Sequence, residues 1–282
     1  MKKKNTTVLL ILIFIFGLSL LLYPSLSNYW NSMHSTKAIG SYAEEVATLD
    51  EDRYQHLWDA AIVYNDELRT RSNQYILDEE QEKRYHELLN VGGTGIMGYI
   101  EIESLGVSLP IYHGTDETVL QIAVGHLEWT SLPVGGEGTH TVLSGHRGLP
   151  SAKLFTDLDE LMVGDTFILR ILDEILTYEV DQILIVDPKD TSALATEEGK
   201  DYCTLVTCTP YGVNSHRLLV RGHRVENAEA AKIVRLTSDA VQIDPLLVAP
   251  VVAMPILLLL LIVLLLPKRP KYKRGGITFE NL

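Results

Sequence analysis

The chain has 282 residues, of which 46% are hydrophobic, and a formal net charge of −13. This length accommodates one domain of ordinary size with additional segments, because domains commonly run to about 100 to 200 residues. The negative charge argues against nucleic acid as a partner, since a phosphate backbone would be repelled. An acidic surface suits either a basic partner or simple solubility.

An apolar run from Val8 to Tyr23 follows Met-Lys-Lys-Lys at the N-terminus. Its composition is that of a signal-peptide core or of a short membrane helix. No Ala-x-Ala cleavage site follows it. The sequence therefore favours an uncleaved signal anchor over residues 1–23.

Residues 24–93 are predicted to form a helical extension. Apolar residues recur at three- and four-residue spacing between Ser41 and about Arg71, which predicts a helix with one apolar face. That face comprises Tyr54, Leu57, Ala61, Tyr64 and Leu68. The pattern repeats from Glu79 to Val91 with Tyr85, Leu88 and Leu89, and Gly92-Gly93-Thr94-Gly95 then ends the helical part.

After Gly95 the hydrophobic period changes to two, which is typical of strands. The candidate strands are Met97–Ile102, Ser108–Tyr112, Thr139–Ser144, Thr166–Ile171, Leu176–Ile185, Tyr202–Cys208 and Arg217–Arg224. A short helix is predicted around Thr118–Val124. So many strands with few helices between them predict a mainly β domain over residues 94–226, a closed or nearly closed β-barrel with helices packed outside.

A second apolar block closes the sequence. Residues 227–245 are expected to be a juxtamembrane segment, and Leu246–Leu266 is an uncharged run long enough to cross a hydrocarbon core of about 30 Å. A buried core helix of this length would normally show a polar face. Basic residues flank both apolar blocks, including a tail at 267–282, so both termini are expected in the cytoplasm and the middle outside the cell.

The chain has only two cysteines, Cys203 and Cys208. An exported domain invites a disulfide between them. On a single strand, however, residues five apart point to opposite faces and lie too far apart to be bridged, so free thiols are expected. Cys203 lies mid-strand and is expected to be inert packing. Cys208 ends the strand at a Pro-Tyr-Gly turn, which places its sulfur at a barrel rim.

A cysteine nucleophile needs a nearby cation and a proton donor for the leaving group. Arg217 begins the next candidate strand and lies beside Cys208 if the two strands pair. An arginine there can favour the thiolate and hydrogen-bond a developing oxyanion. A surface arginine is the alternative interpretation.

Histidine is the expected acid or base, and the chain has nine. His146 is the best candidate because it stands in a Gly-flanked turn directly after the strand Thr139–Ser144. An ordinary loop histidine is the alternative. His34, His56 and His86 lie in the helical part and are expected at the surface, and His216 is expected to face the opposite side of its strand from Arg217.

No metal and no cofactor is predicted. The sequence has no H-E-x-x-H, no paired Cys-x-x-Cys, and no phosphate-loop or dinucleotide fingerprint. Its histidines are scattered rather than clustered at ligand spacing.

With these residues in place, the chain resembles the sortases, cysteine transpeptidases of the Gram-positive cell surface, and specifically the pilin-polymerising class C. The resemblance spans about Gly95 to Arg224, in the blocks "IMGYIEI", "LPIYHGT", "GHLEWTSLPVGGEGTHTVLSGHRGLPSAKLFTDLDEL" and "TLVTCTPYGVNSHRLLVRGHR". The last block carries the family's T-L-x-T-C with an arginine nine residues further on, which is a highly specific signal.

The resemblance implies a sortase-type β-barrel in which Cys208 is the nucleophile, His146 the general acid and base, and Arg217 the transition-state stabiliser. It implies a membrane-anchored enzyme that cleaves an LPxTG-like sorting signal between Thr and Gly. The acyl group would then pass to a lysine amine of a pilin subunit. Two membrane segments, rather than one N-terminal anchor, agree with class C.

One element departs from the class C pattern. Class C enzymes usually carry a lid with an Asp-Pro-aromatic element over the cysteine, whereas here Asp78 is followed by Glu79. The lid is either missing or rebuilt around Tyr75, Ile76 and Leu77, and weaker self-inhibition is expected.

Three alternatives have different sequence requirements. A wall-anchored substrate protein would need a Leu-Pro-x-Thr-Gly motif before its apolar tail, and "VQIDPLLVAP" stands there instead. A secreted cysteine hydrolase of papain or peptidoglycan-peptidase type places cysteine before histidine, whereas His146 precedes Cys208. A sortase that attaches proteins to the cell wall, rather than polymerising pilins, remains open.

Overall fold

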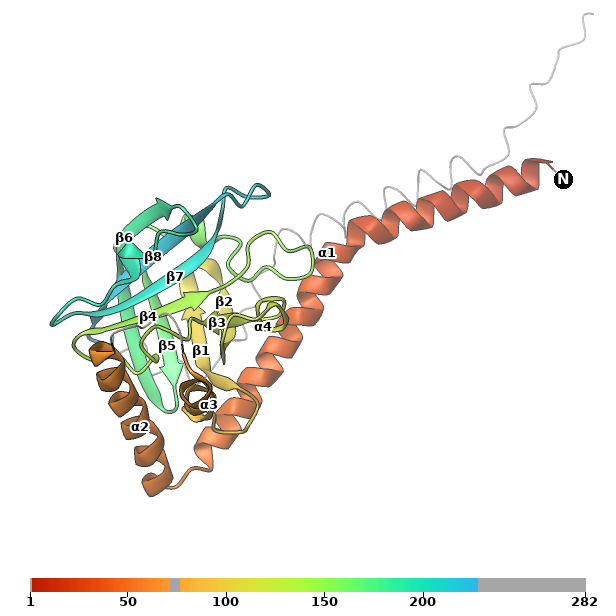
Figure 1. Ribbon diagram of the computed structural model, residues 1–282. Helices are drawn as coiled ribbons and strands as arrows, with labels where there is room; N and C mark the ends of the chain where they lie inside the picture. The colour runs from red at the N-terminus through yellow and green to blue at the C-terminus, as the bar shows by residue number, and fades with distance from the viewer. Residues whose placement is uncertain (1, 72–76, 228–282) are drawn as a thin grey trace, which may run out of the picture. The chain divides into compact units, whose positions relative to one another are not determined.

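The computed structural model describes residues 2–71 and 77–227 (Figure 1). A compact unit begins at Tyr23 and contains all the described strands, while the described part of a second unit is the N-terminal stretch of the first helix, up to Leu22. The expected second apolar block, Leu246–Leu266, and the basic tail at 267–282 lie outside the described residues, as does nearly all of 227–245.

Three helices precede the strands: α1 (Lys2–Ala47), α2 (Glu51–Thr70) and α3 (Glu79–Glu87). The prediction of a single helix from Ser41 to Arg71 is wrong, because α1 ends at Ala47 and a separate helix, α2, begins at Glu51. The Asp50 carboxylate accepts a hydrogen bond from the Arg53 N–H at 2.8 Å and so caps α2. The predicted apolar face is confirmed, since Ala61, Tyr64 and Leu68 are buried.

Helix α3 ends at Glu87, four residues before the predicted end at Val91. Its N-terminus carries a capping box: the Asp78 carboxylate accepts from the Gln81 N–H, and the Gln81 side chain accepts from the Asp78 N–H. The three apolar residues predicted to anchor this helix, Tyr85, Leu88 and Leu89, are buried.

Within the described residues, one helix is long and apolar enough to span a membrane. It is the stretch of α1 from Leu10 to Ala47, whose most apolar part has a mean hydropathy of 2.2 and no buried residue. This finding agrees with the anchor expected over residues 1–23, since an unburied apolar helix needs an apolar environment.

Eight strands close into a barrel in the order β1-β2-β3-β4-β7-β8-β6-β5. Their bounds are β1 (Ile96–Ile102), β2 (Val107–His113), β3 (Val124–His126), β4 (Thr139–Ser144), β5 (Thr166–Ile171), β6 (Glu174–Val186), β7 (Asp201–Thr209) and β8 (His216–Val225). All seven predicted strands are present, and the predicted closed barrel is confirmed.

One strand was not predicted. The expected helix at Thr118–Val124 is only one turn long, α4 (Glu117–Leu120), and Val124 belongs to β3 instead. Strand β3 has three residues, too few to show an alternating pattern. Gly125 lets it lie close to the neighbouring turn, because a Cβ there would come within 2.2 Å of the Gly114 carbonyl oxygen.

The barrel interior and the helices outside it share one hydrophobic core. Tyr64 of α2 and Tyr85 of α3 are fully buried in this core together with barrel residues such as Ile100 and Phe167. The Asn65 side chain fixes α2 to the barrel by bonding both the carbonyl and the N–H of Leu132, at 3.1 and 2.7 Å. The helices therefore complete the hydrophobic core, and loops shape the ends of the strands.

A buried histidine predicts how stability depends on pH. His126 is fully buried; its Nε2 donates to the Ser131 carbonyl at 2.8 Å and its Nδ1 accepts from the Tyr85 hydroxyl at 2.9 Å. Burial lowers the pKa of His126 to about 4, below the value of about 6.5 of an unfolded chain. Acid therefore protonates the unfolded state first. The stabilisation present above pH 6.5 should fall by about 3 kcal/mol towards pH 4.

Chemical denaturation of the full chain between pH 7 and pH 4 checks this prediction. His126→Asn should flatten part of the pH dependence, whereas His56→Gln, at an exposed position of α2, should leave it unchanged. Burial also lowers the pKa of His113 and His140, so their contributions have the same sign. A free energy of unfolding that stays constant or rises as the pH falls would contradict the prediction.

Candidate active site

The two cysteines occupy different environments, as predicted. Both thiols are free; Cys203 is buried and Cys208 is partly exposed. Cys203 lies in the barrel core with Leu205, and burial raises its pKa well above the ordinary value. Cys208 lies five residues further along β7, on the outer face, one residue before the strand ends. Of the two thiols, only Cys208 is accessible to a substrate.

Arg217 lies directly opposite Cys208. Strands β7 and β8 pair antiparallel with Cys208 and Arg217 as partners, and directly opposed residues of a sheet project from the same face. The pairing on which the expected position of Arg217 depended is therefore confirmed. Its Nη1 donates to the carbonyls of Asn214 and His216, at 3.4 and 3.1 Å, which leaves guanidinium N–H groups for a substrate oxygen.

His146 reaches the same end of the barrel through a parallel pairing. Strands β4 and β7 run side by side with Ser144 opposite Val206. Two hydrogen bonds continue this register past the end of β4: the Gly145 N–H donates to the Val206 carbonyl at 3.0 Å, and the Thr207 hydroxyl donates to the Gly145 carbonyl at 2.8 Å. The same register places His146 level with Cys208.

The His146 ring is available for chemistry. Its Nε2 lies 3.9 Å from a carboxylate oxygen of Glu117, and among the described residues this buried nitrogen has no hydrogen-bond partner. By contrast, the ring nitrogens of the buried His113, His126 and His140 all have partners within hydrogen-bond distance. His34, His56, His86 and His216 are exposed, and the first three were predicted to be so.

A second hydrophobic cluster adjoins Cys208 on the outside of the barrel. Val206 lies two residues before Cys208 and so projects from the same face. It belongs to this cluster with Val142, Leu194 and Leu219, against which pack Leu127, Trp129, Leu184, Val186 and Ala193. The four cluster members are buried, so only the partly exposed residues packed against them can offer apolar area to a ligand beside the thiol.

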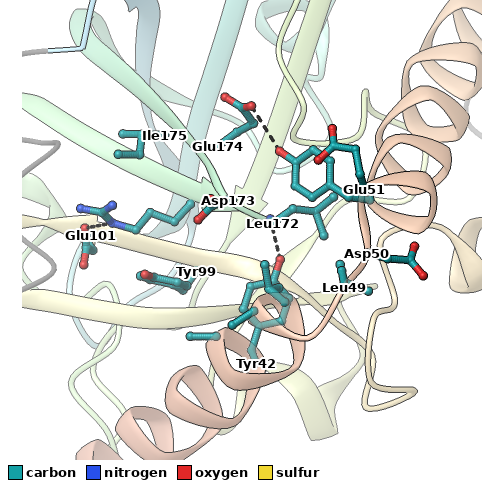
Figure 2. Close-up of a pocket in the computed structure, with 15 residues that line it drawn as sticks. Tyr42, Leu49, Asp50, Glu51, Tyr99, Glu101, Leu172, Asp173, Glu174 and Ile175 are labelled. Atoms are coloured by element: carbon teal, nitrogen blue, oxygen red, sulfur yellow. Dashed lines mark hydrogen bonds and ion pairs between the residues drawn. The ribbon is translucent and has the colours of Figure 1, made fainter.

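A separate cavity of about 710 Å³ lies between the α1–α2 junction, β1 and the β5–β6 turn (Figure 2). It adjoins the start of β6, whereas Arg217 pairs with Val186 at the other end of that strand. The polar groups of the cavity largely bond one another. The Tyr42 hydroxyl accepts from the Leu172 N–H at 2.7 Å, and the Arg170 guanidinium pairs with Glu101 at 2.6 Å. No histidine or cysteine lines it, so the cavity has no nucleophile of the predicted kind.

Among residues 2–71 and 77–227, no cluster of His, Cys, Asp and Glu side chains is arranged to hold a metal ion. The possible lid is only partly described. The Asp78 side chain caps α3, and Leu77 packs against the hydrophobic core. Tyr75 and Ile76 lie outside the described residues. Weaker self-inhibition therefore stays a prediction.

Comparison with known proteins agrees with this arrangement. The Sortase domain family matches residues 100–225. Sortase C1 of Streptococcus agalactiae is 51% identical, with a TM-score of 0.67 over 68% of this chain and 100% of that one. Sortase C-1 of Streptococcus pneumoniae is 43% identical, with a TM-score of 0.61 and the same coverage of both chains.

Among the curated relatives, Sortase D of Bacillus subtilis is 35% identical over 131 residues. That match covers 45% of this chain and 63% of the relative, less than two thirds of the relative's length. The chain belongs to the sortase family, whose members are cysteine transpeptidases. Its structural neighbours place it with class C.

Proposed function

We propose that this chain is a membrane-anchored, extracellular cysteine transpeptidase of pilus assembly. It cleaves an LPxTG-like sorting signal between Thr and Gly and joins the Thr acyl group to a lysine amine of a pilin subunit. The observation that carries the proposal is that Cys208 and Arg217 are cross-strand partners on β7 and β8, and that the turn with His146 follows β4 at the same end of these adjacent strands.

The first half-reaction is acyl transfer to the enzyme. The Cys208 thiol gives its proton to His146, and the thiolate attacks the Thr carbonyl carbon. Negative charge develops on the carbonyl oxygen, where the Arg217 guanidinium donates hydrogen bonds. His146 then protonates the departing glycine amine, the C–N bond breaks, and a thioester with Cys208 remains.

The second half-reaction is transfer to the acceptor. A lysine amine of the next pilin subunit attacks the thioester carbonyl while His146 removes a proton from that amine. The C–S bond breaks and an isopeptide bond forms, and His146 returns the proton to the departing Cys208 sulfur, which regenerates the thiol. The enzyme is then back in its starting state. Because the acyl group is held on Cys208 between the two half-reactions, the reaction is ping-pong, and it needs no cofactor.

The apolar cluster beside Cys208 supports this substrate class. The cluster residues Val206 and Leu219 lie on the face of β7 and β8 that also carries Cys208 and Arg217. Those two residues are themselves buried, so Leu and Pro side chains of a sorting signal would contact the partly exposed residues packed against the cluster, such as Leu184 and Val186. A Clostridium perfringens sortase C that is 43% identical has been solved with a C-terminal cell wall sorting motif.

The proposed location is the outer face of the cell membrane. The apolar stretch of α1 supports an anchor at the N-terminus, and the sequence supports a second span at 246–266 with a basic cytoplasmic tail at 267–282. The proposed division has residues 24–93 as a helical extension, 94–226 as the catalytic barrel and 227–245 as a juxtamembrane segment. Membrane lipid is then a permanent partner of both spans.

A sortase that attaches proteins to the cell wall is the second candidate. The relatives are not all of class C, since they include Sortase A of Streptococcus agalactiae, 30% identical over 117 residues. The two candidates share the first half-reaction and differ only in the amine that resolves the thioester. The choice of acceptor therefore separates them.

The test uses the full chain in detergent micelles and a pilin subunit with its sorting signal intact. We expect covalent ladders on a denaturing gel, which disappear when the acceptor lysines of the pilin are methylated. A wall-type sortase would instead give monomer joined to an added oligopeptide amine and no ladders. Cleaved monomer without joining to any amine would point to a cysteine hydrolase and contradict the proposal.

A further inference from the structure

Arg147, the residue after His146, is a buried cation that no step of the proposed reaction uses. Its side chain is only 10% exposed. Its Nη2 donates to the Asp159 carboxylate at 2.5 Å, and its guanidinium lies over the Tyr211 ring, 5.8 Å from the centroid. The second distance is within the range of a cation–π contact.

These contacts join three separate segments around the candidate active site. Arg147 stands in the turn that carries His146, after β4. Asp159 belongs to the short helix η2 (Leu158–Glu160), and Tyr211 lies in the loop between β7 and β8, three residues after Cys208. One side chain therefore bridges the turn of the candidate acid–base group and the loop that follows the candidate nucleophile.

The turn itself is packed from both sides. On one side the Phe155 N–H donates to the His146 carbonyl at 3.1 Å, and a Cβ on Gly145 would come within 2.7 Å of the Phe155 ring. On the other side Gly148, at φ +76°, lies against Tyr211, whose ring would be 3.0 Å from an added Cβ. The backbone at His146 thus has little room to shift while Tyr211 stays in place.

The burial of Arg147 is not a simple source of stability. Its Nε is buried and has no hydrogen-bond partner among the described residues. Removing a cation from water costs free energy, which a single ion pair offsets only in part. A buried N–H donor without a partner adds to this cost. A buried charge kept at such a cost, next to a candidate acid–base residue, fits a role in positioning.

We propose that Arg147 is a positioning residue, which holds the His146 turn against the loop after Cys208 through Asp159 and Tyr211. The proposal rests on the roles of Cys208 and His146 in the proposed function. General acid–base catalysis needs the imidazole within about 2.6–3.2 Å of the proton it moves. A displacement of about 1 Å can cost on the order of 10²-fold in rate.

The first readout needs no sorting signal. It is the rate of Cys208 alkylation by iodoacetamide between pH 5 and pH 9, measured on the full chain in detergent with Cys203→Ala as background. His146→Ala defines the profile of a thiol without its imidazole. Arg147→Gln should move the wild-type profile towards that of His146→Ala. Lys153→Ala, which removes the neighbouring ion pair with Asp157, should leave the profile unchanged.

The second readout separates positioning from substrate binding. In transfer assays, Arg147→Gln should lower kcat about 10- to 100-fold and leave KM within about 3-fold. Arg147→Lys keeps the charge but not the planar fork, so it should recover only part of the rate. The double variant with Tyr211→Ala should be no slower than the slower single variant, because both changes break the same bridge.

The possible results are distinct. If Arg147→Gln keeps the wild-type profile and kcat while His146→Ala changes the profile, the positioning proposal is overturned and the assignment of His146 stands. If neither variant changes the profile, both are overturned. Losses that add in the double variant also overturn the bridge. If Arg147→Gln fails to fold, judged by its melting curve, Tyr211→Ala at an exposed position tests the bridge from its other end.

Discussion

Replacing Cys208 with alanine should abolish both cleavage of the sorting signal and transfer to lysine, with a loss of at least about 10⁴-fold in rate. The thioester cannot form without this sulfur, and no other described thiol can take its place. The second cysteine, Cys203, is fully buried in the barrel core on the opposite face of the same strand. Release of the glycine-side fragment, followed by mass spectrometry, measures the effect.

Cys203→Ala is the matched control. It removes one sulfur atom from the core, so a loss of about 1 kcal/mol in the free energy of unfolding is expected. The rates of cleavage and transfer should stay close to those of the wild type. A Cys208→Ala chain that still cleaves the signal would refute the assignment, as would a folded Cys203→Ala chain that does not.

Arg217→Ala should have the second large effect. Its guanidinium is directly opposite Cys208, with N–H groups that its bonds to Asn214 and His216 do not occupy. Loss of an oxyanion donor typically costs about 10²- to 10³-fold in kcat. KM should change little, because the charge that Arg217 stabilises develops only in the transition state. Arg217→Lys should be intermediate, since lysine supplies charge without the fork.

The control for this prediction lies on the same strand. Arg221 projects from the same face of β8 as Arg217, four residues away, and pairs with Asp181 at 3.0 Å. Arg221→Lys should leave kcat within about 2-fold of the wild type, because its partners are structural. Equal losses at the two positions would mean that Arg217 acts through stability rather than on the oxyanion.

The alternation of apolar and polar residues predicted most of the strands, because a strand that packs against a core on one face needs this alternation. Strand Thr166–Ile171 buries Phe167, Leu169 and Ile171 in the barrel core, and this alternation is visible in the sequence. The three-residue β3 shows no such alternation, and only its place between β2 and β4 makes it a strand. The break before α2 carried a readable signal, since Asp50 precedes two further acidic residues in the manner of an N-cap.

The site was predictable in part. The position of Arg217 beside Cys208 followed from an antiparallel pairing of two neighbouring strands, which local sequence can suggest. The position of His146 could not be derived in that way, because β4 and β7 are parallel and separated by two other strands in the chain. The resemblance to the sortases, and not the hydrophobic periodicity, indicated that His146 lies beside Cys208.

The contacts that surround these residues were not predictable. Glu117 and Tyr211 approach His146 and Arg147 only through the fold, and no spacing rule connects them. Arg147 was visible in "SGHRG", but its burial and its bridge are properties of packing. The buried histidines His113 and His126 likewise carry no pattern that separates them from surface histidines.

The most direct test of the central claim is to locate the acyl group on the enzyme. The full chain in detergent is incubated with a sorting-signal peptide in the absence of any acceptor amine, quenched in acid, digested and mapped by mass spectrometry. The account predicts a thioester of the peptide, ending at its Thr, on Cys208. An acyl group on Cys203 or on another residue, or cleavage without any acyl-enzyme, would contradict it.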